Sequence, residues 1–245
     1  MFVDYPPSLD QRLSRSDTFR FSCHKGLSCF NSCCRNKHLP LTPYDVLRLK
    51  TALGLDSDEF LSRHTLYNID PRSSFPIISI RMKNNPERSC PFVSPEGCTV
   101  YEDRPTACRL FPLARAVALG MEGDERREFF TLLDIPGCLG LREPAVMSVE
   151  QWMHDQGLEA YIAMNDPMVD FVLRAKNALG RPLDEASLRR VIVSCYNIDV
   201  FRDFVFSTNF LDAFEIEEKM CRRARDDDVA LLELGLVYLK RGLAS

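Results

Sequence analysis

Eight of the ten cysteines lie at or before position 138, and their side chains are the most chemically capable in the sequence. They occur as Cys23-x5-Cys29-x3-Cys33-Cys34, then Cys90-x7-Cys98-x9-Cys108, and finally Cys138. Thiolates are soft ligands that suit zinc, copper(I) and iron-sulfur clusters, and four of them complete a tetrahedral zinc site or hold a cubane cluster. Eight such ligands are enough for two sites.

The first thiol segment, residues 21–35, is rich in Ser and Cys and has neither helical nor strand periodicity. We expect a loop that is organised by what it binds. Because neighbouring side chains tend to diverge, Cys33 and Cys34 either serve different sites or lie on different faces of one cluster. The spacings match neither a paired CxxC zinc ribbon nor a ferredoxin run. Cys90-Pro91 is nevertheless similar to the Cys-Pro step that ends ferredoxin motifs, which favours iron-sulfur.

A few other residues could be ligands. His24 and His38 flank the first thiol segment and could bind zinc. Cys195 and Cys221 instead fall within helical apolar patterns, which favours packing in a core over metal binding.

Composition and charge exclude some partners. The formal net charge is −4, with acids and bases interspersed, so we expect no surface that grips a nucleic-acid backbone. Residues 1–7 lack the pattern of a signal peptide, and no apolar run is long enough to span a bilayer. We therefore expect a cytoplasmic protein with no nucleic-acid or membrane partner. In a reducing compartment, a set of ten cysteines is more often metal-binding or catalytic than disulfide-bonded.

Helix signals follow the first thiol segment. Thr42 suits an N-cap, Pro43 the first helical position and Asp45 the positive end of the helix dipole. The helix should run to about Leu53, because Gly54 can close it in the left-handed conformation.

A second short helix and several strands are predicted next. Asp56 and Glu59 form a capping pair that opens the helix, which should run through Arg63. Segments rich in β-branched or aromatic residues should form short antiparallel strands: residues 75–82, 90–93 and 98–101, with a turn at 94–97, and a hairpin of 113–119 with 127–133 across 120–124. An Ala-rich helix is the alternative for residues 113–119.

After Pro144 the composition shifts toward helix formers. Ser148 should cap an amphipathic helical stretch that extends to about Ala178, and two further helical tracts are predicted at 184–206 and 211–241. The predicted fold class is α+β. It comprises an N-terminal arm (residues 1–20), a metal-stapled, loop-rich domain with short strands and helices (21–144) and a mainly α-helical C-terminal domain (145–245).

Several separated blocks of the sequence occur in the order of a known family. Cys-x5-Cys-x3-Cys-Cys is followed by Leu41-Thr42-Pro43-Tyr44-Asp45, Cys90-Pro91-Phe92, Gly97-Cys98-Thr99-Val100-Tyr101-Glu102-Asp103-Arg104-Pro105 and Cys108-Arg109-Leu110-Phe111-Pro112. Residues 21–140 thereby resemble the YkgJ-type cysteine-cluster family, described as a zinc- or iron-chelating domain. The resemblance implies zinc or an iron-sulfur cluster, most simply 4Fe-4S, held by the family's eight cysteines: Cys23, Cys29, Cys33, Cys34, Cys90, Cys98, Cys108 and Cys138. The first spacing is longer here than the usual Cys-x2-Cys.

Three arginines lie close in sequence to these cysteines: Arg35, Arg104 and Arg109. Guanidinium groups can offset the negative charge of several thiolates in one pocket, or clamp the carboxylate of a substrate. Arg104 has a further option, which is to pair with Glu102 or Asp103.

Two classes of function follow, and we favour the first. It is a metal-binding module for metal handling, electron transfer or partner recognition. The second is a cluster-containing enzyme that modifies protein side chains, since the flagellin lysine methylases share this kind of cysteine cluster. The sequence shows no CxxxCxxC radical motif and no Ser-His-Asp arrangement, so catalytic residues are not assigned. Counting the protein ligands at each metal would separate the two classes, because a site saturated by cysteines leaves no open position for a substrate.

Overall fold

A computed structural model describes residues 12–71, 73–119, 126–133, 135–179, 182–214 and 216–242. The chain forms two compact units that alternate along the sequence. The cysteine unit comprises Met1–Pro40 and Met82–Ala163, and the helical unit comprises Leu41–Arg81 and Met164–Ser245. Short antiparallel strands and helices make an α+β fold, as predicted. The sequence-based division at about residues 20 and 145 stays a prediction.

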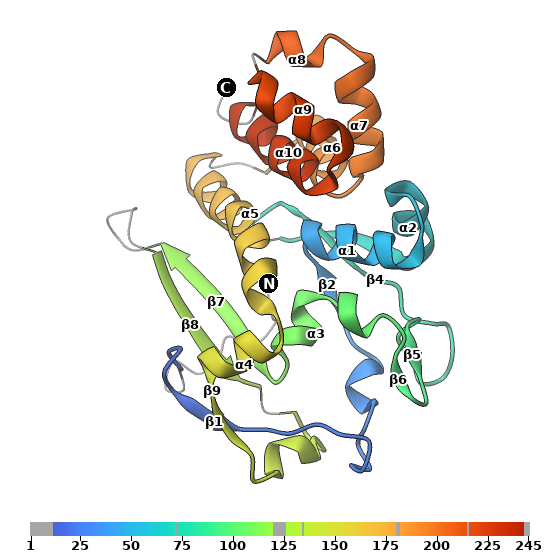
Figure 1. Cartoon of the computed structure of the whole chain (residues 1–245), viewed down its shortest axis with the longest axis vertical. Coiled ribbons are helices and arrows are strands. Elements are labelled where there is room, and N and C mark those ends of the chain that lie inside the picture. The colour runs from blue at the N-terminus through green and yellow to red at the C-terminus, as the bar shows by residue number, and fades with distance from the viewer. Residues whose placement is uncertain are drawn as a thin grey trace. The chain divides into compact units, whose positions relative to one another are not determined.

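The cysteine unit contains short antiparallel strand pairs (Figure 1). The pairs are β1 (Thr18–Arg20) with β9 (Val146–Ser148), β5 (Val93–Ser94) with β6 (Gly97–Cys98), and β7 (Leu113–Leu119) with β8 (Arg126–Leu132). Its helices are the 3-10 helices η2 (Ser32–Cys34), η3 (Tyr101–Asp103) and η4 (Leu139–Arg142), and the α-helices α3 (Thr106–Leu110) and α4 (Val149–Asp155). A longer helix, α5 (Leu158–Leu179), starts in this unit and continues into the helical unit.

The core of the cysteine unit is aromatic. Phe19 and Phe21 meet Trp152 edge-on, with ring centroids 6.1 and 5.5 Å apart. Phe21 also meets Phe111 edge-on at 5.6 Å. Cys138 packs against the same buried cluster. Burial of these rings therefore fixes the last cysteine of the proposed ligand set to the core.

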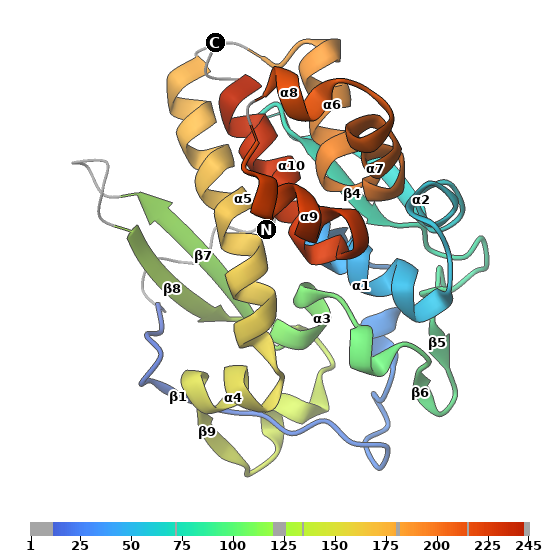
Figure 2. The same cartoon turned by 45° about the horizontal axis from the view of Figure 1, so that its top comes forward.

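The helical unit combines a small sheet with a group of helices. Its strands lie in the order β2 (Pro40–Leu41), β4 (Pro76–Ile80) and β3 (Thr65–Ile69). Its helices are α1 (Pro43–Leu53), α2 (Ser57–His64), α6 (Glu185–Cys195), α7 (Ile198–Ser207), α8 (Phe210–Ala213), α9 (Glu218–Asp226) and α10 (Asp228–Gly242). Helix α10 packs against α6, α7 and α9 (Figure 2).

The two predicted N-terminal helices are confirmed, together with their caps. The hydroxyl of Thr42 accepts the N–H of Asp45 at 3.1 Å, and the Asp45 carboxylate accepts the N–H of Thr42 at 2.8 Å. Gly54 closes α1 with φ at 64°. Asp56 accepts the N–H of Glu59 at 2.7 Å where α2 begins. Local side-chain chemistry was sufficient to place these boundaries.

One of the strand predictions is confirmed, two strands are shorter than predicted, and one strand was missed. The hairpin of residues 113–119 with 127–133 is confirmed as β7 and β8, and its turn, 120–124, lies outside the described residues. The strands expected at 90–93 and 98–101 are shorter, because β5 and β6 have two residues each and the chain turns into η3 after Val100. Strand β3 was not predicted. The last four residues of β3 are all exposed, so the strand has no buried face. A strand without a buried face does not need apolar residues that alternate with polar ones, and that alternation is the pattern by which a strand is predicted.

Each predicted helical tract in the C-terminal part is divided. The first is split into α4 and α5 at Gly157, whose φ is 60°. The second is split into α6 and α7 at Asn197, and the third into α8, α9 and α10. In the described residues, no helix is both long and apolar enough to cross a membrane.

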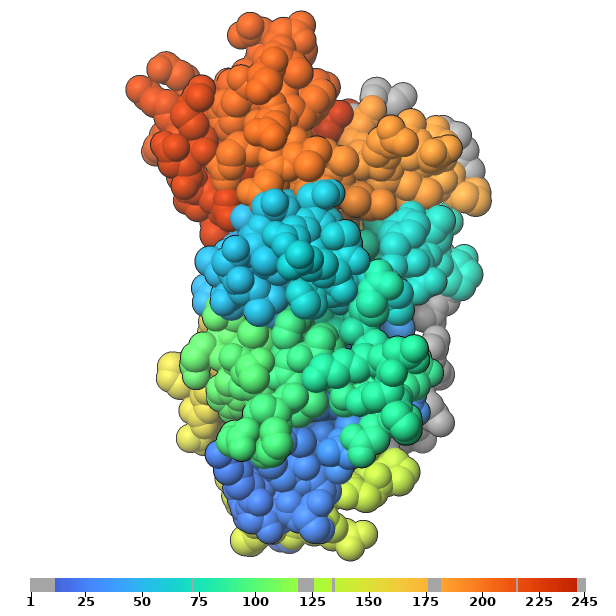
Figure 3. Space-filling view, turned by 90° about the vertical axis from the view of Figure 1, so that its right-hand side faces the viewer, coloured from blue at the N-terminus to red at the C-terminus, as the bar shows by residue number. Residues whose placement is uncertain are grey.

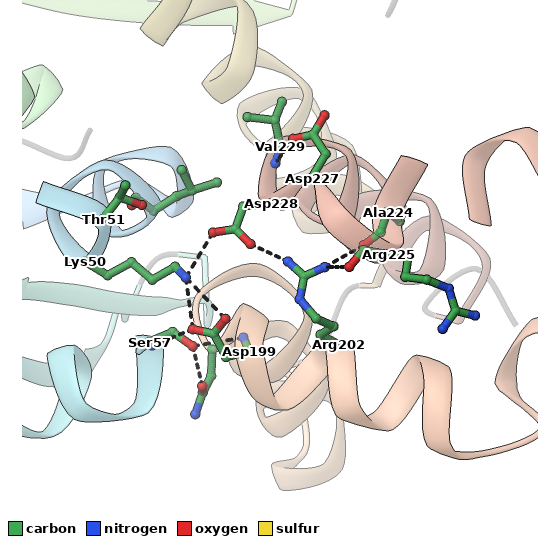
Figure 4. Close-up of polar contacts among 12 residues, drawn as sticks. Lys50, Thr51, Ser57, Asp199, Arg202, Ala224, Arg225, Asp227, Asp228 and Val229 are labelled. Atoms are coloured by element: carbon green, nitrogen blue, oxygen red, sulfur yellow. Dashed lines mark hydrogen bonds and ion pairs between the residues drawn. The ribbon is translucent and has the colours of Figure 1, made fainter. Parts of the chain in front are cut away.

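A charged network ties helices of the helical unit together (Figure 4). The Lys50 ammonium on α1 lies 3.0 Å from the Asp199 carboxylate on α7 and 2.9 Å from the Asp228 carboxylate on α10. Asp199 also accepts the N–H of Ser57 at 2.7 Å, and Arg202 bonds Asp228. The Lys50 side chain is only 9% exposed, so these contacts hold a mostly buried charge.

Candidate metal centre

All eight cysteines predicted as ligands lie in the cysteine unit, and none of them forms a disulfide. They sit on loops or short elements: Cys23 and Cys29 in the loop after β1, Cys33 and Cys34 in η2, Cys90 before β5, Cys98 at the end of β6, Cys108 in α3 and Cys138 before η4. Cys23 and Cys33 are exposed, Cys90 is buried and the others are partly buried. The thiols therefore come from separate loops and short elements of one unit.

Main-chain hydrogen bonding joins the first thiol segment to the second. The N–H of Cys90 donates to the carbonyl oxygen of Cys34 at 2.8 Å. Arg35 and Ser89 beside them form an isolated antiparallel bridge. Figure 3 shows the N-terminal part of the chain (blue) directly beside the part around residue 100 (green). The backbone thus brings two cysteine groups together that are far apart in the sequence.

A second junction joins the first thiol segment to Cys138. The N–H of Leu139 donates to Sγ of Cys29 at 3.3 Å, and the N–H of Ser22 donates to the carbonyl oxygen of Gly140 at 3.0 Å. A Cβ at Gly140 would lie 2.8 Å from the Ser22 carbonyl oxygen. Glycine is therefore required for this close approach of two backbones.

The first group of thiols surrounds Cys23. Burial, followed by the nearby thiols of Cys33, Cys29 and Cys138, raises the pKa of Cys23 to about 11. Thiolates repel one another in such a group, so several can coexist only when a cation neutralises them. A bound metal ion supplies that charge.

The second group surrounds Cys34. Its Sγ lies 4.0 Å from Sγ of Cys33, and the hydrogen bond between them lowers the pKa of Cys33 to about 7. The same bond raises the pKa of Cys34, as do burial and the thiols of Cys33, Cys108 and Cys90. Burial raises the pKa of Cys90, and the thiols of Cys98 and Cys33 add to that rise. The adjacent Cys33 and Cys34 therefore stand where the two groups meet.

The chemistry of the donors fits a soft metal ion. We assign Cys23, Cys29, Cys33 and Cys138 to the first group and Cys34, Cys90, Cys98 and Cys108 to the second, with Cys33 also acting on Cys90 and Cys98. Within the described residues, which include all eight, no three His, Cys, Asp or Glu side chains converge closely enough to hold an ion as they stand. Ligation would thus draw the thiols inward, as expected where metal binding and folding are coupled. The ligand set stays a prediction.

The remaining candidates have other contacts. Cys195 lies in the helical unit and is fully buried, and burial raises its pKa to about 12. Cys221, also in that unit, donates to the carbonyl oxygen of Ile216 at 3.6 Å. Nε2 of His24 lies 3.5 Å from the Glu143 carboxylate. None of these contacts directs a side chain to either thiol group.

Two arginines of the cysteine unit, Arg104 and Arg109, are buried and have protein oxygens as partners. Arg104 donates to the carbonyl oxygen of Tyr101 at 2.6 Å and to Oε1 of Gln156 at 2.5 Å. Arg109 donates to the carbonyl oxygens of Arg104 at 3.1 Å and Gln156 at 2.6 Å, and to the hydroxyl of Tyr161 at 3.2 Å. All three guanidinium nitrogens of Arg109 are used, which argues against the predicted carboxylate clamp.

The sequence offered Glu102 or Asp103 as a partner for Arg104, and this option was wrong. Arg104 bonds Tyr101 and Gln156 in place of the expected carboxylates of Glu102 and Asp103. Sequence reasoning missed Gln156 because it lies 52 residues from Arg104. Its one local signal is its place after α4, where a helix end leaves carbonyl oxygens without helical partners.

No curated protein and no solved structure matches the chain. One family model, CxxCxxCC, described as a "putative zinc- or iron-chelating domain", matches residues 22–133. That segment holds every cysteine of the two groups except Cys138.

The name of the family model gives two residues in each of the first gaps, whereas this chain has five and three. The longer first gap folds into turns, because the N–H of Leu27 donates to the His24 carbonyl oxygen at 3.1 Å and the N–H of Phe30 donates to that of Leu27 at 2.9 Å. The extra residues are thus accommodated without a change in the order of the thiols. Residues 22–133 thus match the model of the YkgJ-type CxxCxxCC family, whose description is that of a zinc- or iron-chelating domain.

Proposed function

We propose that the eight cysteines form two tetrathiolate metal sites, one on each thiol group. The proposal is supported by the presence in one unit of eight cysteines, enough for two sets of four, and by the 4.0 Å between Sγ of Cys33 and Sγ of Cys34, which places these adjacent thiols where two sites could meet. Side chains of adjacent residues diverge from the backbone, so each member of that pair can serve a different site. Zinc and a 4Fe-4S cluster each accept four cysteine thiolates, and either one fits the donor set.

A site filled by four cysteines has no open position for a substrate. This favours metal handling, electron transfer or partner recognition over chemistry on a metal-bound substrate. An enzyme of the flagellin lysine methylase kind would need a vacant ligand position or a cluster at the floor of a pocket. A compartment that keeps thiols reduced, such as the cytoplasm, suits ten cysteines that form no disulfide.

The first test is to purify the full chain without oxygen and measure metal, acid-labile sulfide and the visible spectrum. A brown protein with iron and sulfide identifies clusters, whereas a colourless protein with stoichiometric zinc identifies zinc sites. Protein that is folded and holds neither metal contradicts the proposal.

Serine variants then test the division into two sites. Cys23→Ser and Cys108→Ser should each lose one of the two sites and keep the other, and the double variant should lose both. Cys221→Ser is the matched control, because this thiol bonds within the helical unit and should leave the metal content unchanged. If either single variant loses all bound metal, a single eight-cysteine centre replaces the two-site arrangement.

A further inference from the structure

Strand β3 is the outer strand of the sheet in the helical unit, and in the described residues β4 is its one neighbour there. Leu66, Tyr67 and Ile69 are 42%, 45% and 48% exposed, and Asn68 is exposed as well. Outer strands of soluble proteins are usually protected from further pairing by a charged side chain, a proline or a bulge. The sequence of Thr65–Ile69 contains neither a charge nor a proline. This edge of the sheet is therefore open to a further strand.

The hydrogen bonds to β4 show which main-chain groups of β3 point outward. The N–H of Asp70 donates to the carbonyl oxygen of Phe75 at 2.9 Å, and the N–H of Arg81 donates to that of His64 at 2.7 Å. Directly opposed residues of antiparallel strands alternate between hydrogen-bonded and non-hydrogen-bonded pairs. With the observed register, the even-numbered residues of β3 bond β4. The odd-numbered residues direct their N–H and C=O groups away from β4, and they are Thr65, Tyr67 and Ile69.

The outward groups of Thr65 already have partners within the chain. Its N–H donates to the carbonyl oxygen of Leu61 at the end of α2. Its carbonyl oxygen accepts Nη2 of Arg81 at 2.7 Å. The outward groups of Tyr67 and Ile69 have no such partner in the part of the chain that the structure describes. The main-chain groups of these two residues are thus available to a further strand.

We propose that β3 pairs with β3 of a second copy of this chain, antiparallel and about a two-fold axis at Asn68. Tyr67 of each copy then lies opposite Ile69 of the other, and every such pair exchanges both of its main-chain hydrogen bonds. A register with Tyr67 opposite Tyr67 would oppose Ile69 to Thr65, whose groups are already bonded. A register with Ile69 opposite Ile69 would oppose Tyr67 to Pro71, which has no N–H. The register centred on Asn68 avoids both conflicts.

The side chains of β3 suit a second copy in this register. Tyr67 and Ile69 lie on one face of the strand, so each Tyr67 packs against an Ile69 of the other copy. An aromatic side chain opposite a β-branched one favours strand pairing. Asn68 meets its own copy on the other face, where the two amide groups can bond each other. Because β3 is uncharged, two copies meet without like-charge repulsion across the strands.

The size of the contact sets how tight the dimer should be. A standard interface buries about 800 Å² on each partner, and one short strand edge provides less than this. We therefore expect a weak dimer, with a dissociation constant of roughly 10 µM to 1 mM.

Sedimentation of the full chain over a concentration series measures this dimer. A reducing agent is present, so that no disulfide between cysteines joins the copies. The average mass should rise from 28.1 kDa toward twice that value with increasing concentration. Tyr67→Lys and Ile69→Glu should each raise the dissociation constant about 10-fold or more, because each places a charge against an apolar side chain and the symmetric dimer contains that contact twice.

The double variant Tyr67→Lys/Ile69→Glu tests the register. The ammonium at position 67 of each copy would face the carboxylate at position 69 of the other, so most of the lost affinity should return. Val200→Lys is the matched control, because Val200 is a 41% exposed apolar residue on α7 of the same unit. It should leave the dissociation constant unchanged. Circular dichroism of each variant checks that the fold is retained.

Three results overturn the inference. The first is a wild-type chain that stays at 28.1 kDa up to about 1 mM. The second is a dimer that tolerates both Tyr67→Lys and Ile69→Glu, since it must use another surface. The third is a double variant that dimerises more weakly than either single variant, since its charges do not then face each other. None of these measurements depends on the thiols, so the two proposed metal sites stand or fall separately.

Discussion

The N–H of Leu139 donates to Sγ of Cys29 at 3.3 Å, between residues 110 positions apart in the sequence. This bond joins the start of η4 to the loop that carries Cys29. It also holds Cys138, the neighbour of Leu139, close to the first thiol segment. The last ligand of the first group is thus attached to the loop it must join before any metal is bound.

The close approach at Gly140 should be essential to the first site. Gly140→Ala places a Cβ 2.8 Å from the carbonyl oxygen of Ser22 and 2.8 Å from Cε2 of Phe21, so one backbone has to shift. We expect a loss of about 1–3 kcal/mol in the free energy of unfolding and loss of metal from one site. Urea unfolding and metal analysis measure both. Gly54→Ala is the comparison: it meets no atom within 4 Å but sits at φ 64°, and should lower stability without lowering metal content.

Metal removal should unfold the cysteine unit selectively. Trp152 is the single tryptophan and packs on Phe19 and Phe21 in the core of that unit, so its fluorescence reports on that unit alone. We expect a chelator to shift the tryptophan emission to the red, while far-ultraviolet circular dichroism retains most of its helical signal. Unchanged tryptophan emission in demonstrably metal-free protein would contradict the coupling of metal binding to folding.

Lys50 should stabilise the helical unit more than a surface charge does. Lys50→Met leaves the carboxylates of Asp199 and Asp228 without their shared ammonium, at a position where the lysine side chain is 9% exposed. We expect the free energy of unfolding to fall by about 3 kcal/mol. Arg63→Met, which removes an exposed pair with Glu59, should cost less than about 1 kcal/mol. Equal losses in the two variants would show that the network does not stabilise the unit.

The same network predicts how stability depends on pH. Although burial raises the pKa of Asp199, the N–H of Ser57 and the Lys50 ammonium hold it below 3.8. Although burial lowers the pKa of Lys50, Asp228 and Asp199 hold it above 10.5. The carboxylate contribution is present above pH 3.8 and lost as pH falls through the lowered pKa, and the lysine contribution is present below pH 10.5 and lost as pH rises through the raised pKa.

The difference in unfolding free energy between wild type and Lys50→Met should therefore be constant between these limits and shrink beyond each of them. Urea unfolding over a pH series measures this difference, and subtraction removes the titration of the thiols, which both proteins share. A difference that does not vary with pH outside the limits would contradict the assigned shifts.

Position 235 on α10, where this helix contacts α6, should tolerate no side chain larger than that of glycine. A Cβ at Gly235 on α10 would overlap the carbonyl oxygen of Ser194 on α6. Gly235→Ala should lower the free energy of unfolding by about 1–3 kcal/mol, even though alanine is the better helix former. A urea midpoint equal to that of the wild type would show that the helices can separate at no cost.

Local chemistry made part of the fold predictable. The start of α1 is set by Thr42 and Asp45, and its end is set by Gly54. All three lie at the ends of the helix itself, so the sequence alone was enough to predict where the helix begins and ends. The types and number of the cysteines likewise pointed to soft-metal chemistry. These features depend on neighbours in the sequence or on the donor atom itself.

The arrangement of the site depends on distant residues and was not predictable in the same way. Nothing near Cys34 in the sequence indicates that its carbonyl oxygen accepts the N–H of Cys90. Gln156 likewise reaches Arg104 only through the packing of the cysteine unit. Strand β3 was missed because pairing with β4, rather than an alternating pattern, defines it.

The alternation of the two units along the chain has a consequence for synthesis. The ribosome first makes the thiols of the first segment and then residues 41–81, which belong to the helical unit. The thiols of the second segment are made only after that. Cys138 emerges later still, several seconds after Cys23 at about 5–20 residues per second. During that interval the early thiols are present without their partners, so the proposed first site cannot be complete until Cys138 has been made.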